Sequence, residues 1–341
     1  MISANSVQHV SPKSNRALSV SLVPVEQVHH LLEQNAGKVM GIVSYGIGNI
    51  DRKNTAVPCL NVQLNQLGNS DYVEMWNSSA AVEIGEDASI KYSKNGALLF
   101  ACIDIPCAPD IQQQSKELYL KLFHFLKKHD YKHVLRVWNH FPRINEYDGE
   151  LERYQEFCVG RHQAFSEFYG EDFHGRLPAA SAIGTSADRF SLYLIASKSP
   201  GLNLENPRQI SAYSYPEQYG PCSPSFARAT VYRGEGVNKL FLSGTASIVG
   251  HETVHKDQVE RQLSETLNNI EHILRHDSLQ SQPIEANTFK FIKVYLRQRE
   301  YLPMVKSRVQ QFFRAESNIL YLHGDICRRD LLLEIEGISE L

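Results

Sequence analysis

The two halves of the chain repeat the same order of predicted elements, and this repetition limits the folds that the sequence can adopt. In each half, two strand-like segments joined by a turn precede an amphipathic helix, a strand, a second helix and further strands. The segment at 198–207, KSPGLNLENP, has the Pro, Gly and Asn content of a connector. We therefore predict an α/β (α+β) chain of two units, 1–200 and 201–341, each a mixed β-sheet with helices packed on one face.

The first half begins its repeat with a hairpin. Strand-like segments at 90–94 and 97–105 flank Asn95-Gly96, a dipeptide typical of hairpins with a type I′ turn. Asp110 suits the start of the following helix, whose apolar positions recur at three- and four-residue steps. These positions are Ile111, Leu118, Leu122, Phe125 and Leu126. A strand at 133–139, a second helix at 149–169 and a strand at 191–197 are then expected.

The second half continues with the same order. ARATVY (227–232) and KLFLSGTAS (239–247) surround the loop RGEGVN, and one apolar face then indicates a helix. The residues of that face are Val259, Leu263, Leu267, Ile270 and Leu274. A strand at 288–296, a helix near 299–313 and strands at 318–327 and 330–338 complete the predicted unit.

Charge and hydropathy exclude several function classes. With 35 Lys and Arg against 38 Asp and Glu, the formal net charge is −3, which provides no basic field for nucleic acid. The chain has neither the apolar core of a signal peptide nor an apolar run of about 18 residues, so we expect a cytoplasmic protein without membrane association. The six cysteines are scattered without a CxxC pair, which favours neither a zinc ribbon nor a disulfide framework.

Residues 251–255, His-Glu-Thr-Val-His, match the HExxH motif of zinc hydrolases. That motif requires a helix, on which the two histidines share a face. Here Gly250 and a strand precede it, and 256–258 resembles the first turn of the next helix, so a loop is predicted. Glu271 is a conceivable third ligand, but no spacing supports it. We therefore predict no metal site.

Four arginines are candidates for binding an anion. A guanidinium group fits a carboxylate with two hydrogen bonds, so converging arginines suit a dicarboxylate, although each taken alone is more often part of a surface ion pair. Three tyrosines nearby are candidates either for the same pocket or for half-buried strand positions. The arginines are Arg143, Arg153, Arg161 and Arg228, and the tyrosines are Tyr213, Tyr215 and Tyr219.

The last predicted strand places two glutamates on one face. Alternation along the strand places Glu334 and Glu336 on one face and Leu333 and Ile335 on the other. A carboxyl group among apolar neighbours has a raised pKa and can act as a general acid. From the residues alone, however, a solvent-facing edge strand with two ordinary glutamates is favoured, and Cys327 has the same two interpretations.

Longer runs of sequence resemble known families. FLSGTASIVGHETVHKDQVERQLSETLNNIEHIL (241–274) is similar to the signature of RidA (YjgF) proteins. VWNHFPRIN, GELERYQEFCVGRHQAF, LPAASAIGT, SYPEQYGPCSPSFARA, SGTASIVG and CRRDLLLEIEGI together resemble the chorismatases, which are distantly related to RidA. The resemblance covers most of the chain after about residue 90.

The resemblance implies two RidA-like units and an enzyme that removes pyruvate from chorismate without a metal or redox cofactor. Chorismate is a dicarboxylate, so two arginine sites are expected. We assign them to Arg161 and Arg228, with Arg153 and Arg143 as further candidates. By the same resemblance, Tyr213 or Tyr215 orients the substrate. The state of assembly stays open between a monomer and a homotrimer.

Glu334 matches the family's catalytic glutamate, which protonates the enolpyruvyl methylene group. Cys327 and Gly244 are similar to the cysteine and glycine that accompany 3-hydroxybenzoate formation, with 4-hydroxybenzoate as a second possible product. Alternatives are hydrolysis of chorismate to a dihydroxycyclohexadiene carboxylate, a RidA-like imine or enamine deaminase, and a non-enzymatic sensor of small anions. Nothing in the sequence selects the pathway served.

Overall fold

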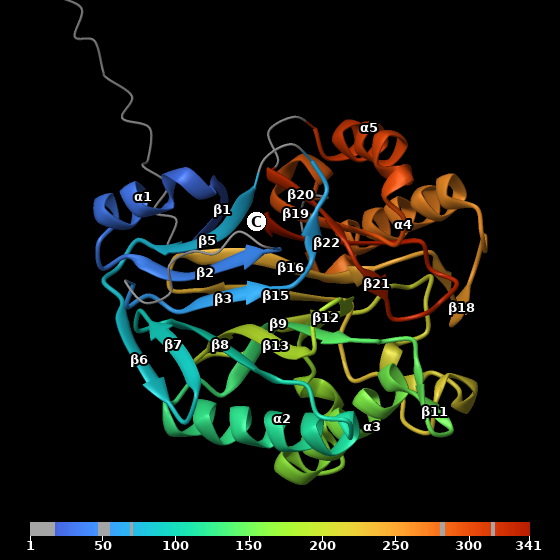
Figure 1. Cartoon of the computed structure of the whole chain (residues 1–341), viewed down its shortest axis with the longest axis horizontal. Coiled ribbons are helices and arrows are strands. Elements are labelled where there is room, and N and C mark those ends of the chain that lie inside the picture. The colour runs from blue at the N-terminus through green and yellow to red at the C-terminus, as the bar shows by residue number, and fades with distance from the viewer. Residues whose placement is uncertain (1–17, 47–54, 69–70, 280–283, 315–317) are drawn as a thin grey trace, which may run out of the picture.

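The computed structural model of the chain describes residues 18–46, 55–68, 71–279, 284–314 and 318–341 (Figure 1). Within these ranges, the larger strands form two seven-stranded sheets and one four-stranded sheet. Both large sheets are mixed, because each contains one parallel pair among antiparallel ones. The predicted α/β class, with two mixed-sheet units and helices on one face of each, is confirmed.

The first large sheet consists mainly of strands from 83–197. Its order is β21-β12-β9-β13-β8-β7-β6. Helices α2 (Ile111–Lys128) and α3 (Arg153–Tyr169) pack on one face of it through a shared apolar cluster. The strands are β6 (Glu83–Asp87), β7 (Ile90–Lys94), β8 (Leu98–Pro106), β9 (His133–Pro142), β12 (Ala179–Thr185), β13 (Arg189–Ser197) and β21 (Asp325–Ile326).

The second large sheet has the order β14-β15-β16-β22-β19-β20-β4. Helices α4 (Val259–Leu274) and α5 (Leu302–Phe313) cover its outer face, on the side of the molecule opposite α2 and α3 (Figure 1). The strands are β4 (Asn65–Gln66), β14 (Leu202–Leu204), β15 (Ala229–Gly234), β16 (Val237–Thr245), β19 (Phe289–Leu296), β20 (Asn318–His323) and β22 (Leu333–Glu340).

A third, smaller sheet has the same topology as the central part of the two large ones. Its order is β1-β5-β2-β3, in which the strand that comes last in the sequence lies between the first two. The same arrangement occurs in β8-β13-β9-β12 and in β16-β22-β19-β20. The sequence pattern predicts two repeats, and the structure therefore adds a third. The elements are β1 (Leu18–Pro24), α1 (Val28–Gln34), β2 (Val39–Tyr45), β3 (Cys59–Val62) and β5 (Tyr72–Ser78).

The inner faces of all three sheets meet in one apolar core. Trp76 of the small sheet, Trp138 and Tyr193 of the first large sheet, and Phe241 and Tyr295 of the second belong to this cluster. Two strands also cross between the halves, because β21 joins the first large sheet and β4 joins the second. The division of the chain at residue 200 stays a prediction.

Local differences from the predicted elements have simple causes. The hairpin at 90–106 is confirmed, but its turn is not type I′, because Gly96 has φ +91° while Asn95 does not adopt a positive φ. The Asn95 side chain instead accepts hydrogen bonds from the amides of Ala97 and Leu98. Two successive positive φ angles, which a type I′ turn requires, occur at Glu235 and Gly236 between β15 and β16.

The second helix of the first half begins at Arg153 rather than near 149. A short hairpin precedes the helix, in which the two-residue strands β10 (Tyr147–Asp148) and β11 (Leu151–Glu152) pair. The Glu152 side chain then forms a capping box with Gln155. No helix in the described ranges is long and apolar enough to span a membrane.

The last strand corrects an expectation. From the residues alone, β22 was expected to be a solvent-facing edge strand, but it lies between β16 and β19 in the middle of the second large sheet. Glu334 is 4% exposed and Glu336 is 1% exposed. The neighbouring strands β16 and β19 and the inner face of the first large sheet, which contributes Arg136 and Trp138, bury these side chains. Local alternation alone does not reveal this environment.

Candidate active site

A cavity of about 340 Å³ opens where β22 and β16 approach the start of α3. Residues from both halves of the chain line it. Glu334, Gly244 and Cys327 lie in its wall together with the arginine Arg228, and tyrosines from several loops complete the lining. These four residues were singled out from the sequence, and the structure brings them together.

Glu334 is a buried carboxyl group at the wall of this cavity. It lies on β22 opposite Tyr295 of β19, and its Oε1 atom has no hydrogen-bond partner in the described part of the chain. Burial raises the pKa of Glu334 to about 8, with a further contribution from the negative charge of Glu336. Arg136 lowers the pKa of Glu334, but by less than burial and Glu336 raise it. Glu334 is therefore protonated at neutral pH.

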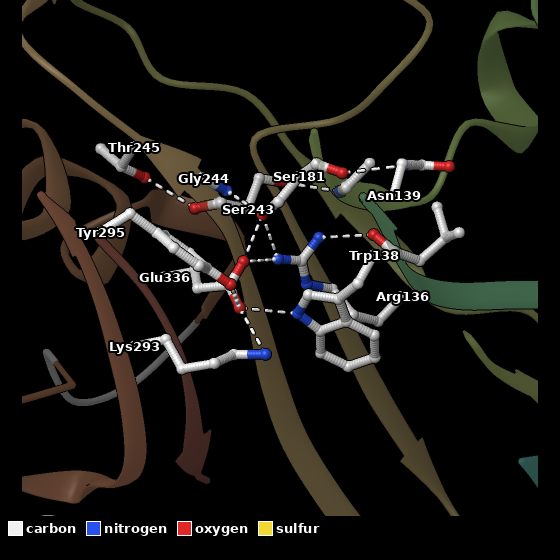
Figure 2. Close-up of polar contacts among 12 residues, drawn as sticks. Arg136, Trp138, Asn139, Ser181, Ser243, Gly244, Thr245, Lys293, Tyr295 and Glu336 are labelled. Atoms are coloured by element: carbon white, nitrogen blue, oxygen red, sulfur yellow. Dashed lines mark hydrogen bonds and ion pairs between the residues drawn. The ribbon is translucent and has the colours of Figure 1, made fainter. Parts of the chain in front are cut away.

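Glu336, two residues further along β22, is in the opposite state. Its Oε1 lies 2.8 Å from Lys293 Nζ and accepts a hydrogen bond of 2.7 Å from Trp138 Nε1. Its Oε2 lies 2.5 Å from Arg136 Nη2. Figure 2 shows Lys293, Trp138 and Arg136 around the Glu336 carboxylate. Burial alone would raise its pKa, but Lys293 and Arg136 together hold the pKa at about 2. Glu336 is therefore ionised at neutral pH.

Gly244 makes room for the Glu334 carboxyl group. In the pairing of β16 with β22, Ser243 and Gly244 together lie opposite the single residue Glu336, which is a β-bulge. A Cβ atom placed on Gly244 would lie 1.9 Å from Glu334 Oε1. The amide of Gly244 donates to Ser181 Oγ at 3.1 Å. Close approach of the carboxyl group, rather than an unusual backbone angle, is therefore the reason for glycine here.

Cys327 follows β21 and faces the same cavity. Burial raises the pKa of its thiol to about 12, and the charge of Glu334 adds to this shift. A thiol with such a pKa is neutral at physiological pH, and the thiolate is the nucleophilic form. Cys327 therefore presents a neutral thiol to the cavity at physiological pH.

Arg228 supplies a cation to the cavity. The residue precedes β15, and its guanidinium group donates to the hydroxyl of Tyr215 at 2.6 Å and to the carbonyl of Ile210 at 3.0 Å. The rings of Phe226 and Tyr215 flank it, with centroids at 5.1 Å and 5.5 Å. Its Nε is buried and unpaired among the described residues. Buried N–H groups are normally paired, so Arg228 has capacity for an anionic ligand.

Arg161 is buried in α3 and is not among the residues that line the cavity. Its guanidinium group lies over the rings of Tyr119 and Phe165, at 4.9 Å and 5.5 Å from their centroids. Two of its nitrogens, Nε and Nη2, make no hydrogen bond within the described ranges. Its assignment to a substrate carboxylate stays a prediction.

The other predicted ligands also lie outside the cavity lining. Arg153 donates to the carbonyls of Pro109 and Pro142 and pairs with Asp148 at 3.3 Å. Arg143 forms an exposed ion pair of 3.0 Å with Asp188. The ring of Tyr213 packs on His174, with centroids 5.0 Å apart. These contacts are structural, and the substrate-binding roles of the three residues stay predictions.

Two arginines that sequence analysis did not select also line the cavity. Arg328 lies with its guanidinium carbon 3.9 Å from the ring centroid of Tyr219, and it donates to the carbonyl of His251 at 2.8 Å. Arg329 donates to Glu152 at 3.1 Å across the mouth of the cavity. Their position directly after Cys327 was a signal that the sequence offered.

The HExxH segment is not helical. Gly250 and His251 form the turn between β17 (Ile248–Val249) and β18 (Glu252–Thr253), and His255 has φ +60°. The prediction that this segment is not helical is confirmed, although Glu252 and Thr253 form a short strand within it. In the described part of the chain, no group of three or more His, Cys, Asp or Glu side chains is placed to hold a metal ion.

Comparisons with known proteins agree on one family. A family model described as Chorismatase FkbO/Hyg5-like, N-terminal, matches residues 74–196. A 3-hydroxybenzoate synthase of Streptomyces hygroscopicus is 34% identical over 311 residues, which cover 88% of this chain and 91% of that protein. A chorismatase of the same species is 32% identical over 307 residues, 88% of this chain and 89% of that one.

The fold agrees as well. The crystal structure of a chorismatase covers 95% of this chain and 98% of its own, with a TM-score of 0.85 at 30% sequence identity. The similarity therefore extends over all three sheets, including the small one, whose strands lie between Leu18 and Ser78.

Proposed function

Because this chain belongs to the chorismatase family, we propose that it releases the enolpyruvyl side chain of chorismate as pyruvate and forms 3-hydroxybenzoate. The observation that carries the proposal is Glu334, a buried carboxyl group held protonated in the wall of a cavity that also contains Arg228. A proton donor beside an anion-binding cation is the arrangement that an acid-catalysed reaction of a dicarboxylate requires.

In the proposed first step, Glu334 protonates the terminal methylene carbon of the enolpyruvyl group. The O–H bond of the acid breaks and a C–H bond forms, which leaves an oxocarbenium-like centre at the ether carbon and a carboxylate on Glu334. A pKa near 8 suits this role, because the acid is protonated at neutral pH and still gives up its proton to a reactive double bond.

In the proposed second step, the bond between ring carbon C3 and the ether oxygen breaks and pyruvate leaves. The neighbouring hydroxyl oxygen on C4 bonds to C3 while its proton passes to the Glu334 carboxylate, which gives an arene oxide. Cleavage of the C4–O bond of this oxide, with loss of the C3 proton and protonation of the oxygen, gives 3-hydroxybenzoate, and cleavage of the C3–O bond gives 4-hydroxybenzoate in the same way. The atoms of chorismate then divide between pyruvate and a hydroxybenzoate, and no water is consumed. In the hydrolytic alternative, water attacks instead and a dihydroxycyclohexadiene carboxylate forms.

Arg228 is the proposed ligand of one substrate carboxylate, with Tyr215 holding its guanidinium group in place. The unpaired Nε of Arg228 supports this role, since a bound carboxylate supplies the missing acceptor. Arg161 is the proposed second ligand, on the same ground of unpaired buried nitrogens.

Gly244 and Cys327 support 3-hydroxybenzoate as the main product, with 4-hydroxybenzoate as a minor one. Both residues lie against Glu334 and so define the space available to the ring near the acid. A thiol at this position is small and leaves room for the ring. Because it is neutral, it carries no charge that would attract water toward the ring.

The proposal is tested by incubating the purified protein with chorismate. Pyruvate is followed by a coupled assay and the ring product by chromatography, with the exposed Glu83→Gln variant as a matched control. Pyruvate together with 3-hydroxybenzoate is the expected result. Pyruvate with a dihydroxycyclohexadiene carboxylate would reassign the branch, and absence of pyruvate would overturn the proposal.

A further inference from the structure

A chain of buried charges leads from Glu336, two residues from Glu334 on β22, to the small N-terminal sheet. Lys293 of β19 lies between two carboxylates, with its Nζ 2.8 Å from Glu336 Oε1 and 3.2 Å from Glu74 Oε2. Glu74 belongs to β5 and is completely buried. The equivalent inserted strands of the three sheets, β5, β13 and β22, thus bring Glu74, Tyr193 and Glu336 to one place in the core.

Glu74 has the partners of an ionised carboxylate. Trp76 Nε1 donates to its Oε1 at 2.7 Å, and the Tyr45 hydroxyl donates to its Oε2 at 2.8 Å. The hydroxyl of Tyr193 lies 3.1 Å from the same oxygen. Burial raises the pKa of both tyrosines well above the ordinary value, so these hydroxyls stay neutral donors. Hydrogen bonds from neutral donors together with Lys293 stabilise the anion.

The buried charges balance only while Glu334 is neutral. Arg136 and Lys293 are the cations of this network, and Glu336 and Glu74 are its anions. Ionised Glu334 would be a third carboxylate against two cations. A buried charge without compensation is strongly unfavourable. Glu336 favours a proton on Glu334 and Arg136 opposes it. With Lys293 and Glu74 included, the charges of the network cancel and leave no surplus cation to stabilise ionised Glu334.

We propose that Glu74 is a positioning residue for the reaction, which balances Lys293 from the N-terminal sheet and thereby keeps Glu334 in its proton-donating form. The inference rests on the proposed function, in which Glu334 is the acid. It gives the small sheet a chemical role, because without Glu74 the network carries a net positive charge that favours ionised Glu334.

Other titratable and charged groups face the same network. Neutral hydroxyl and imidazole groups adjoin it on the surrounding strands, a thiol lies after β21, and arginines line the cavity that Glu334 faces. They are Tyr45, Tyr193, Tyr295, His140 and Cys327 among the neutral groups, and Arg228 and Arg328 among the cations. None of these cavity arginines contacts Glu74 or Lys293, so a change at Glu74 leaves them in place.

The first test substitutes Glu74→Gln, which keeps an acceptor for Trp76 and removes one negative charge. Lys293 keeps its ion pair with Glu336 and so stays charged. The pH above which kcat for chorismate falls should then decrease by about one unit. Glu83→Gln, an exposed carboxylate paired with Lys94, is the matched control and should leave that pH unchanged.

A second variant changes the charge in the opposite sense. Lys293→Gln removes one cation, and the pH at which kcat falls should increase. A purely structural role for the network predicts loss of activity in both variants without opposite shifts. If Glu74→Gln does not fold, the shift in Lys293→Gln alone decides the question.

Ionisation of Glu334 is also measured without turnover, from the infrared band of its protonated carboxyl group, which is assigned by its loss in Glu334→Gln. This band should disappear at lower pH in Glu74→Gln than in the parent protein. Folded Glu74→Gln with an unchanged midpoint would overturn the inference. A shifted midpoint in a protein that does not turn over chorismate would instead overturn only the proposed function.

Discussion

Glu334 and Glu336 lie two residues apart on β22, and the structure gives them opposite environments. Glu334 lies near the end of the strand that faces the cavity, and its Oε1 has no hydrogen-bond partner in the described part of the chain. The part of the strand in the core surrounds Glu336 with Lys293, Arg136 and Trp138. Burial is nearly equal, yet the pKa of Glu334 rises to about 8 and that of Glu336 falls to about 2.

The difference shows that compensation, rather than burial, decides which carboxyl group keeps its proton. Burial penalises the charged form of both groups, but only Glu336 has cations within ion-pair distance. The compensated glutamate in turn repels a second negative charge at Glu334. One glutamate is thus the structural anion, and the other is the acid that the proposed reaction uses.

The largest effect is expected when the uncompensated glutamate is changed. Glu334→Gln should bind chorismate with a Kd close to that of the parent protein and lose about 10²- to 10⁴-fold in kcat, because an amide cannot deliver the proton. Pyruvate release and equilibrium binding measure the two quantities separately. A kcat similar to that of the parent protein would remove Glu334 from the mechanism.

Changing the compensated glutamate should affect stability instead. Glu336→Gln leaves Arg136 and Lys293 with less negative charge in the core, and we expect about 3–5 kcal/mol less free energy of unfolding. Urea denaturation at pH 7 checks this value. A variant as stable as the parent protein would show that Glu336 is not the anion on which the network depends.

The space around the acid is probed at Gly244. Gly244→Ala places a Cβ atom against Glu334 Oε1, so the carboxyl group must move, and a loss of about 10- to 100-fold in kcat is expected. Gly175→Ala is the matched control, because no heavy atom lies within 4 Å of its added Cβ and its φ is ordinary. Equal activity of the two variants would contradict the role assigned to close approach.

The smallest effect is expected at Cys327. Cys327→Ala should change the ratio of 3- to 4-hydroxybenzoate while total pyruvate release stays within a few-fold of the parent protein, because the neutral thiol defines space rather than chemistry. Chromatography of the ring products measures the ratio. An unchanged ratio would take Cys327 out of the choice between products.

Sequence patterns predicted the parts of the fold that depend on near neighbours. The amphipathic faces of α2 and α4, the hairpins and the two repeated units follow from local periodicity, and all are present. The third sheet was not predicted, because its single helix has only seven residues and therefore shows little amphipathic periodicity. Its topology is recognisable only from strand pairing.

The residues of the candidate site were likewise predicted only in part. Alternation placed Glu334 and Glu336 on one face, and the resemblance selected Glu334, Gly244, Cys327 and Arg228, which line one cavity. Local sequence could not show which glutamate is compensated, because Lys293 and Arg136 come from distant strands. It also gave no reason to choose Glu74, whose role depends on contact between sheets.

The pH dependence of kcat for chorismate tests the central claim most directly. The folded-state pKa of Glu334 is raised, so the acid is protonated and active below about pH 8 and loses its proton above it. We predict a kcat that is nearly constant below pH 7 and falls about tenfold per unit above pH 8. A kcat that rises as the pH passes through 8 would mean that the ionised carboxylate is the active form, and would contradict Glu334 as the proton donor.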